Sequence, residues 1–280
     1  TGYTPNSRDH RKILIVDGST AIVGGVNLST TYQSSPGKSS GPPGLTAAYW
    51  RDTDMEIKGP IVAQLEKLFV NQWTNQAGPK LHPKNYFPKN YNRGTEVVRV
   101  IGSTPDEVIP IYYITLLSAI RHAQERIWLM SAYFVPTDQQ LHDLIAAARR
   151  GVDVRLLLPD RSDSITAVTI QHSHYYDLLK AGVKIYESHD EILHSKTVVI
   201  DGIWSVVGSS NFDYRSVVFN DEVDVIVLGH ATGRELEKLF EKNTAKAHQI
   251  DLTEWNRRPL AQKMKETIDP LWESIVESYL

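Results

Sequence analysis

The pattern His-x-Lys-x₄-Asp occurs twice in this chain, once near its start and once beyond its middle. Its two copies are His10, Lys12 and Asp17, and His194, Lys196 and Asp201. In each copy a glycine follows the histidine at the fourteenth position and an asparagine at the seventeenth, which are Gly24 and Asn27, and Gly208 and Asn211. A lone His-x-Lys is usually a surface pair, but two copies with matched offsets indicate one active site assembled from two similar halves.

These residue types suit the transfer of a phosphoryl group. One histidine can attack phosphorus while a second protonates the leaving oxygen, since imidazole titrates near neutrality. Lys12 and Lys196 would neutralise the phosphoryl oxygens, and Asn27 and Asn211 would donate hydrogen bonds to them. Residues two apart on a strand face the same side, so each motif presents its histidine and lysine to one pocket. We therefore expect both motifs to converge on a single phosphate-sized space.

Each catalytic histidine also needs a carboxylate that orients its other ring nitrogen. Glu222 follows His194 by 28 residues, and Asp52 follows His10 by 42, which becomes 28 when a 14-residue insertion in the first copy is removed. Asp52 and Glu222 are therefore predicted to orient the histidines. Asp17 and Asp201 lie at predicted turns, where we expect them to tie the backbone rather than contact substrate.

The two motifs are embedded in matching predicted elements. Strands at 13–16 and 20–25 flank an Asp-Gly turn, a strong hairpin signal, and 197–200 and 203–208 repeat this arrangement. Strands at 54–59 and 224–229 follow, and each precedes a helix with the sequence Leu-Glu-Lys-Leu-Phe, at 65–69 and 236–240. Thr232 and Glu235 have the spacing of a capping box at the start of the second helix. The repeat is thus structural as well as chemical.

The copies differ in what precedes and interrupts them. Residues 33–48 form a Ser/Gly/Pro-rich inserted loop in the first copy only, either a lid or substrate-selecting segment or a plain solvent loop. Before the second motif the predicted elements alternate: strand 97–101, helix 110–124, strand 126–134, helix 138–150, strand 152–158, helix 167–181 and strand 183–187. Such alternation predicts a mostly parallel sheet covered by helices.

The predicted domains are 1–94, the C-terminal part of a first half, 95–250, a complete second half, and 251–280, a helical tail. Only nine residues precede His10. We therefore expect the first half to be truncated at its N-terminus, and residues 1–280 alone to be poorly soluble or inactive because the shortened sheet would expose unpaired edges.

Composition excludes several classes of protein. The chain has 280 residues, 41% of them hydrophobic, and a formal net charge of −3, so it has no global basic field for nucleic acid. It contains no cysteine, which excludes disulfides and thiol catalysis. No apolar run approaches the roughly 20 residues that span a bilayer.

The doubled motif resembles that of the phospholipase D superfamily, and within it the bacterial cardiolipin synthases. The supporting segments are Ser131-Ala-Tyr-Phe-Val-Pro136, Pro159-Asp-Arg-Ser-Asp-Ser164, Leu193-His-Ser-Lys196, Asn211-Phe-Asp-Tyr-Arg-Ser216 and Asn220-Asp-Glu222. The resemblance implies an α/β fold of two α/β/α-sandwich halves related by pseudo-two-fold symmetry. It also implies a phosphohistidine mechanism that needs neither a metal nor another cofactor.

The resemblance assigns His10 as the nucleophile and His194 as the general acid and base. One position differs between the copies, because Ser209 in the second corresponds to Gly25 in the first. Ser209 is therefore a candidate phosphate contact on one side of the site only.

Three functions are compatible with these residues. The first is a phosphatidyltransferase at the bacterial membrane surface, peripheral in this chain, which acts on phosphatidylglycerol or a similar phospholipid and passes the phosphatidyl group to a lipid or alcohol hydroxyl. The second is a phospholipase D-type phosphodiesterase with water as acceptor; a nuclease is less favoured, because the slight acidity gives no reason to expect nucleic acid as a partner. The third, a non-enzymatic scaffold, is disfavoured by the intact histidines, lysines, asparagines and carboxylates of both copies.

Overall fold

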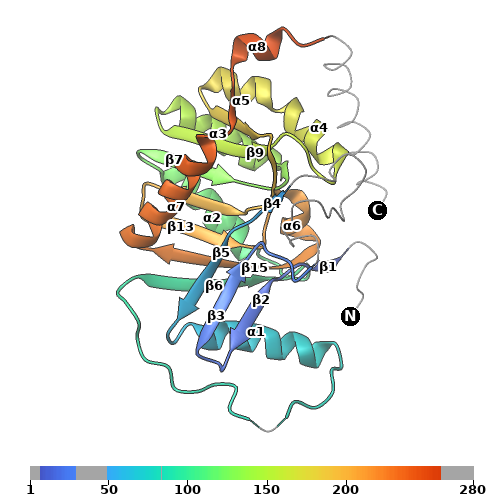
Figure 1. Ribbon diagram of the computed structural model, residues 1–280, viewed down its shortest axis with the longest axis vertical. Coiled ribbons are helices and arrows are strands. Elements are labelled where there is room, and N and C mark those ends of the chain that lie inside the picture. Colours follow the sequence, from blue (N-terminus) through green and yellow to red (C-terminus); the bar gives the residue numbers. More distant parts are fainter. Residues whose placement is uncertain (1–6, 30–48, 83, 260–280) are drawn as a thin grey trace.

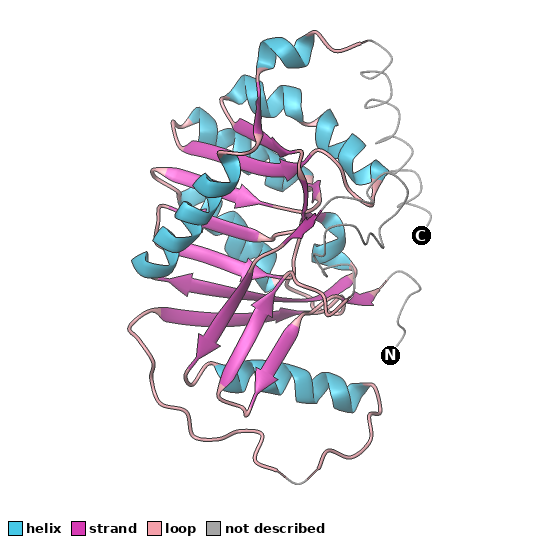
Figure 2. Cartoon of the chain, viewed as in Figure 1, coloured by secondary structure: helices cyan, strands magenta, loops and turns pink. Residues whose placement is uncertain are grey.

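The computed structural model describes residues 7–29, 49–82 and 84–259. Its centre is a nine-stranded sheet in a mixed α/β architecture (Figures 1 and 2). The strand order is β1 (Arg8–Asp9), β15 (Asn220–Leu228), β13 (Trp204–Gly208), β12 (Thr197–Ile200), β7 (Arg126–Met130), β9 (Asp153–Pro159), β10 (Lys184–Ser188) and β16 (His248–Ile250), and β6 (Val97–Ser103) also pairs with β15.

The sheet is mixed, as expected, but the prediction that it is mostly parallel is wrong. Only β1–β15, β7–β9 and β9–β10 are parallel pairs in it. The other neighbours are antiparallel, because the Asp201-Gly202 turn folds β12 and β13 into a hairpin and β15 then returns beside β13. Strand-helix alternation correctly indicated the parallel part, which is the region before the second motif.

Alternate side chains of the central strands point to opposite faces of the sheet and pack into two apolar cores. The second half is therefore a sandwich, with helices covering both faces. Ile127 and Leu129 face one core with α2 (Ile111–His122), α3 (Asp138–Arg149) and α5 (Tyr175–Ala181). Trp128 and Met130 face another, where Leu236 and Phe240 of α7 (His230–Thr244) pack. This alternation follows from the two-residue period of a strand.

The first half repeats the motif-bearing part of the second, strand by strand. Here β2 (Ile13–Val16), β3 (Thr20–Gly24), β5 (Asp54–Lys58) and α1 (Val62–Asn75) correspond to β12, β13, β15 and α7. Gly24 pairs with Asp54 as Gly208 pairs with Asp224. A Cβ on either glycine would lie 2.2 or 2.1 Å from the aspartate Oδ1, which explains both glycines. The local repeat is confirmed, while the two-fold relation between the halves stays a prediction.

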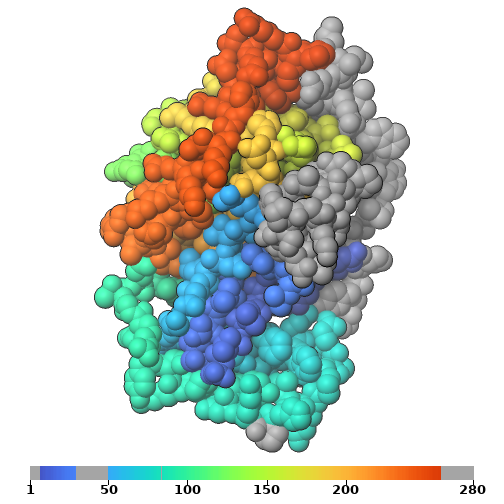
Figure 3. All heavy atoms as spheres, viewed as in Figure 1, coloured from blue at the N-terminus to red at the C-terminus, as the bar shows by residue number. Residues whose placement is uncertain are grey.

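The small sheet of the first half packs on the second half. Ala21, Val23 and Ile57 share an apolar cluster with Val223 and Val225 of β15. In the space-filling view the blue strands of the first half lie directly against the light-blue and teal segments that follow them (Figure 3).

The two Asp-Gly turns have the predicted character. Asp17 and Asp201 both adopt positive φ (53° and 52°), as do the glycines that follow them, which is the geometry of a tight hairpin turn. The Asp201 carboxylate accepts hydrogen bonds from the backbone N–H groups of Gln124, Glu125 and Arg126 at 2.8–2.9 Å. Asp201 thus ties the turn to the start of β7.

Several predicted elements are divided or begin differently. Strand 126–134 ends at Met130 and resumes as β8 (Phe134–Val135), which pairs with β14 (Phe212–Asp213). Helix 167–181 is two helices, α4 (Ile165–Ser173) and α5, which meet at His174. The first break lies beside the second motif, because Ser131 Oγ accepts from Phe212 N and the Tyr133 ring is 6.3 Å from that of His194.

The predicted capping box of Thr232 and Glu235 is wrong. Helix α7 begins at His230 after Gly229, so Thr232 already lies inside it. Its first turn is capped instead by Glu96, which accepts hydrogen bonds from Ala231 N (2.8 Å), Thr232 N (3.1 Å) and Thr232 Oγ1 (2.6 Å). The helix is thus capped by a carboxylate from a distant segment and not by the neighbouring residues that the local pattern indicated.

Two predicted segments lie partly or wholly outside the described residues. The inserted loop 33–48 is outside them, and the tail 251–280 is described only to residue 259. Its described part contains α8 (Leu252–Asn256), where Trp255 is buried against Tyr175 of α5, with ring centroids 4.7 Å apart. None of the helices in the described ranges combines the length and apolar character needed to cross a membrane.

Candidate active site

The two histidines are delivered by short strand pairings between the halves. Strand β1 runs beside the start of β15, and His10 N donates to Asp221 O at 2.9 Å directly after it. Strand β4 (Tyr49–Arg51) pairs with β11 (Glu191–Leu193), and His194 N donates to Arg51 O at 2.7 Å. Each pairing places one histidine next to a segment of the opposite half.

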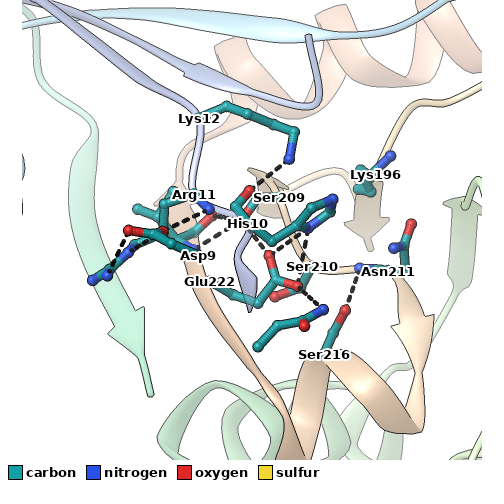
Figure 4. Close-up of polar contacts among 12 residues, drawn as sticks. Asp9, His10, Arg11, Lys12, Lys196, Ser209, Ser210, Asn211, Ser216 and Glu222 are labelled. Atoms are coloured by element: carbon teal, nitrogen blue, oxygen red, sulfur yellow. Dashed lines mark hydrogen bonds and ion pairs between the residues drawn. The ribbon is translucent and has the colours of Figure 1, made fainter. Parts of the chain in front are cut away.

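Each histidine is oriented by a buried carboxylate of the other half. His10 Nδ1 lies 3.0 Å from Glu222 Oε2 (Figure 4). His194 Nδ1 lies 2.7 Å from Asp52 Oδ2. Both carboxylates are almost fully buried, at 0% and 1% side-chain exposure. The sequence offsets assigned one carboxylate to each copy, and the structure shows that the pairs cross between copies. Because Nδ1 is occupied in both rings, Nε2 is the nitrogen left for chemistry.

The two carboxylates are themselves held differently. Ser209 Oγ donates to Glu222 Oε2 at 2.5 Å and accepts from Val223 N at 2.9 Å, and Asn220 Nδ2 donates to Glu222 Oε1 at 3.3 Å. On the other side Asp52 Oδ1 accepts from Thr53 N at 2.8 Å and lies so close to Gly25 that a Cβ there would be 2.1 Å away. The residue that differs between the copies is thus the one beside each carboxylate. The Ser209 hydroxyl bonds to Glu222, whereas Gly25 has no side chain and lets Asp52 lie against its backbone.

Ser209 does not lie where a phosphate contact would. Its side chain is fully buried, and its hydroxyl is used by Glu222 and Val223. The geometry thus contradicts the prediction that Ser209 touches phosphate. It supports a positioning role, in which Ser209 holds the carboxylate that holds His10.

The lysines lie close to both histidine–carboxylate pairs. Lys12 Nζ donates to His10 O at 2.6 Å, and Lys196 Nζ donates to His194 O and lies 3.0 Å from His194 Nδ1. Burial lowers the pKa of Lys12 to about 8, opposed by the charges of Glu222 and Asp52. Burial likewise lowers the pKa of Lys196 to about 7, opposed by Asp52 and assisted by the charge of Lys12. The pKa of each lysine is thus affected by charged groups from both halves, as expected if the two motifs form one site.

His194 is the more buried of the two imidazoles. Its side chain is 7% exposed, against 25% for His10. Burial lowers the pKa of His194, opposed by its hydrogen bond to Asp52 and assisted by the charges of Lys196 and Lys12. The rings of Trp50 and Tyr133 stand edge-on to His194, with centroids 5.2 and 6.3 Å away.

A cavity of about 410 Å³ opens beside His10. Its lining comprises His10, Tyr133, Val135, Ser164, Thr166, Ala167, Asn211, Asp213, Tyr214, Arg215 and Asn220. Asn211 is therefore placed with His10 as predicted. Asn27, half-buried just beyond β3, is not in this lining. Among the described residues, no hydrogen-bond partner reaches the buried amide oxygens of Asn211 and Asn220, so two acceptors beside His10 are unsatisfied there.

Several residues of this site escaped the sequence argument. Burial raises the pKa of Asp213, in the cavity lining, to about 6, opposed by hydrogen bonds from Ser216. Asn220 is two residues before Glu222, a spacing that could have flagged it as facing the same side. Trp50 and Tyr133 carried no local signal, because their contact with His194 depends on which segments meet.

Two further groups behave as structural rather than chemical elements. Burial raises the pKa of Asp224 to about 8, and its carboxylate accepts hydrogen bonds from Ser210 Oγ (2.5 Å) and Ser210 N (3.4 Å). His189 and Glu191, which precede His194 closely in sequence, are paired instead with Asp160 and Arg51. Within the part of the chain that the structure describes, no group of three His, Asp or Glu side chains is arranged to hold a metal ion.

Comparison with known proteins agrees with this geometry. The family model described as "Cardiolipin synthase, PLD-like domain" matches residues 116–244. The chain is 34% identical over 271 residues to a cardiolipin synthase of Geobacillus kaustophilus, which covers 95% of this chain and 52% of the relative. It is 34% identical over 262 residues to cardiolipin synthase A of Pseudomonas aeruginosa, with 91% and 50% covered. The chain thus spans about half the length of these curated relatives.

A solved structure shares the fold. The phosphatidylserine synthase of Haemophilus influenzae aligns with a TM-score of 0.67 at 12% identity, over 97% of this chain and 69% of the other. This likeness extends over both halves. The family match and the curated relatives show that the chain belongs to the phospholipase D superfamily of enzymes and that within it the chain resembles the cardiolipin synthases.

Proposed function

We propose that this chain carries the phosphoryl-transfer centre of a phosphatidyltransferase of the cardiolipin synthase type. The observation that carries the proposal is the crossed arrangement of two histidines, each oriented through Nδ1 by a buried carboxylate of the other half. Such a pair supplies a nucleophile and a proton donor to one phosphorus atom. The curated relatives named cardiolipin synthase support a phospholipid as the substrate.

The first half-reaction forms a phosphohistidine. His10 Nε2 attacks the phosphorus of the phospholipid and the new P–N bond forms, while the P–O bond to the headgroup alcohol breaks and His194 gives its proton to the departing oxygen. His10 suits the nucleophile because it lines the cavity and is the more exposed ring. Glu222 stabilises the positive charge that the ring gains on attack.

The second half-reaction transfers the phosphatidyl group. An acceptor hydroxyl gives its proton to His194 and attacks phosphorus, and the P–N bond breaks to restore His10. Burial lowers the pKa of His194, which favours the neutral ring that accepts this proton. A bound phosphate and the Asp52 carboxylate favour the protonated ring needed in the first step.

The lysines and asparagines stabilise the transition state in this scheme. Lys12 and Lys196 approach from opposite halves and would bind the non-bridging oxygens, as a divalent ion does in other phosphoryl-transfer sites. Asn211 would donate its amide N–H groups from the cavity lining. We assign Asn27 the same role from the first half. Asp17 and Asp201 hold the turns that position the two hairpins.

The deciding experiment incubates the full protein with phosphatidylglycerol vesicles and follows two products separately. Cardiolipin with released glycerol would support transfer to a second lipid. Phosphatidic acid alone would instead identify a phospholipase D-type hydrolase, and cleavage of nucleic acid but not lipid would contradict the proposal outright. The same assay in a strong chelator tests the metal-independent route: loss of activity that a divalent ion restores would contradict it. His10→Ala serves as the inactive reference.

We further propose that the protein works as a peripheral enzyme at the bacterial membrane, since the substrate of this reaction resides in a bilayer. The formal net charge of −3 offers no broad attraction to anionic polymers. Membrane contact through this chain would therefore depend on a local surface and not on its net charge.

A further inference from the structure

Three aliphatic side chains are the most exposed large hydrophobic residues in the described ranges. Val108, Leu28 and Ile165 have exposed fractions of 97%, 95% and 72%, the highest among the large hydrophobic residues of the described ranges. A single exposed apolar residue is ordinary. These three differ because each lies on a segment that adjoins the active site, Leu28 and Val108 in loops and Ile165 at the first residue of α4.

The loop that carries Val108 starts at the carboxylate that orients His10. Ser103, the last residue of β6, pairs with Glu222 in β15, and the loop leaves the sheet immediately after it. Pro110, at the other end of the loop, lines a small cavity together with Asn211 and Ser216. Ile109 beside Val108 is also 60% exposed.

The other two side chains are tied to the site in the same way. Leu28 is three residues beyond Gly25, whose backbone lies against the Asp52 carboxylate that orients His194. Ile165 lies between Ser164 and Thr166, which both line the cavity beside His10. The cavity edge adds Tyr214, 38% exposed, and the exposed cation Arg215. The elements that carry this edge, β1, α4 and α6 (Tyr214–Val218), lie along one side of the molecule (Figure 1).

Taking the proposed function as the basis, we propose that Leu28, Val108 and Ile165 insert into the surface of a lipid bilayer and hold the cavity beside His10 against it. Insertion removes three large apolar side chains from water at the point where a lipid phosphate must enter. Arg215 then faces the phosphate layer.

A lipid surface fits these residues better than a protein partner. Leu28 and Ile165 have polar neighbours such as Ser29 and Ser164, and Val108 lies between Glu107 and the exposed Ile109. The three lie on separate segments, whereas the core of a protein interface is a contiguous apolar patch. Isolated apolar tips with polar flanks suit shallow insertion, in which the flanks stay among the headgroups.

The test compares two triple variants of the full protein by sedimentation with vesicles. One is Leu28→Ser/Val108→Ser/Ile165→Ser. The matched control, Phe87→Ser/Tyr91→Ser/Val97→Ser, removes the same number of exposed apolar side chains (49%, 68% and 64%) from the segment that leads into β6. None of the six residues belongs to the catalytic machinery. Vesicles of phosphatidylcholine alone and of phosphatidylcholine with phosphatidylglycerol separate apolar insertion from charge.

We expect the first triple variant to lose at least tenfold in vesicle affinity on both compositions, and the control to stay within about twofold of wild type. Activity gives a second readout: the first variant should lose tenfold or more on vesicles but keep its rate on a short-chain phosphatidylglycerol below its micelle concentration. Unchanged vesicle binding, equal losses in both triples, or disruption of a dimer without loss of vesicle binding would overturn the proposal. A wild type that acts on neither substrate would contradict the proposed function, while the binding comparison would still decide this one.

Discussion

At the scale of single residues, the catalysis that we propose depends on two carboxylates that orient the histidines. Asp52 and Glu222 are buried, and each fixes the tautomer and direction of a histidine from the opposite half. The offset of 28 residues found both of them in the sequence. Their crossing could not be found that way, because a spacing within a copy says nothing about which copy lies next to which.

The first prediction removes these charges without changing side-chain shape. Asp52→Asn and Glu222→Gln should each lower kcat by roughly 10²- to 10⁴-fold, since an orienting carboxylate in a comparable triad has an effect of this size. Affinity for lipid should change little, because neither side chain lines the cavity. The control is Glu56→Gln, an exposed carboxylate paired with Lys58. A variant with near-normal kcat would show that its histidine does not need the carboxylate.

A second residue-scale prediction concerns pH. Burial lowers the pKa of Lys196 to about 7 and that of Lys12 to about 8, so both lose their charge at far lower pH than an ordinary lysine. If both must be charged to bind phosphate, kcat/KM should fall as pH rises through 7 to 8. Lys196→Arg keeps a charge at all working pH values and should move this alkaline limb upward, even if the rate is lower. An unshifted limb in Lys196→Arg would assign it to another group.

At the scale of elements, the sequence predicted the regular helices and strands but missed the boundaries that are set by tertiary contacts. The two hairpins with their Asp-Gly turns, strands β5 and β15, and helices α1, α3 and α7 all lie where the patterns placed them, with shifted ends. The strand expected at 126–134 ends at Met130 because Ser131 Oγ turns the chain: it donates to Tyr133 O and accepts from Phe212 N. No local pattern encodes that contact.

The start of α7 gives the element-scale prediction. Glu96→Gln should weaken the cap on the N–H groups of Ala231 and Thr232 and cost about 1 kcal/mol in the free energy of unfolding. Hydrogen bonds from Thr232 lower the pKa of Glu96, so its contribution is present above the pKa of the unfolded chain and is lost as pH falls through its folded value. Thermal unfolding at pH 7 should therefore separate Glu96→Gln from wild type, and strongly acidic pH should not.

Glu235→Gln is the matched control, because Glu235 lies on the same helix, is exposed and pairs only with Lys238 among the contacts described. A loss of stability in Glu235→Gln as large as that in Glu96→Gln would restore the capping box that the sequence suggested. Neither variant should alter kcat.

At the scale of the whole molecule, the free energy of unfolding depends on the titration of Asp224. The effect of pH has the opposite sign to that of a carboxyl group whose pKa is lowered on folding. Burial raises the pKa of Asp224 to about 8, well above the 3.8 of a free aspartate. The folded state therefore binds a proton that the unfolded state releases, and this contribution is lost as pH rises from about 4 through 8. Asp224→Asn keeps the shape and removes the titration.

Wild type should consequently lose stability relative to Asp224→Asn by up to about 1.4 kcal/mol per pH unit between pH 5 and 8. The measurement is the difference in denaturant midpoints across that range. The difference between the two proteins also removes the contribution of Lys196, which is common to both. The lowered pKa of Lys196 makes the free energy of unfolding rise with pH above 7, opposite to the effect of Asp224. A difference that stays constant with pH would show that Asp224 is ionised throughout.

The whole-molecule arrangement was predicted in part. The doubled motif and the alternating elements indicated an α/β fold with a repeated unit, and the solved relative shares that fold. The mostly parallel sheet was wrong because each motif hairpin adds antiparallel neighbours. Asp213 and Asn220 were missed as site residues because they lie at strand ends, Asp213 in the two-residue strand β14 and Asn220 at the first residue of β15, whose place beside His10 is set by tertiary packing.

The crossing of His10 with Glu222 and of His194 with Asp52 also bears on how such a protein can evolve. Neither repeat contains a complete histidine–carboxylate pair, because the carboxylate of each repeat orients the histidine of the other. A substitution of either carboxylate therefore alters the surroundings of the histidine in the other repeat, so the two repeats are constrained to change together.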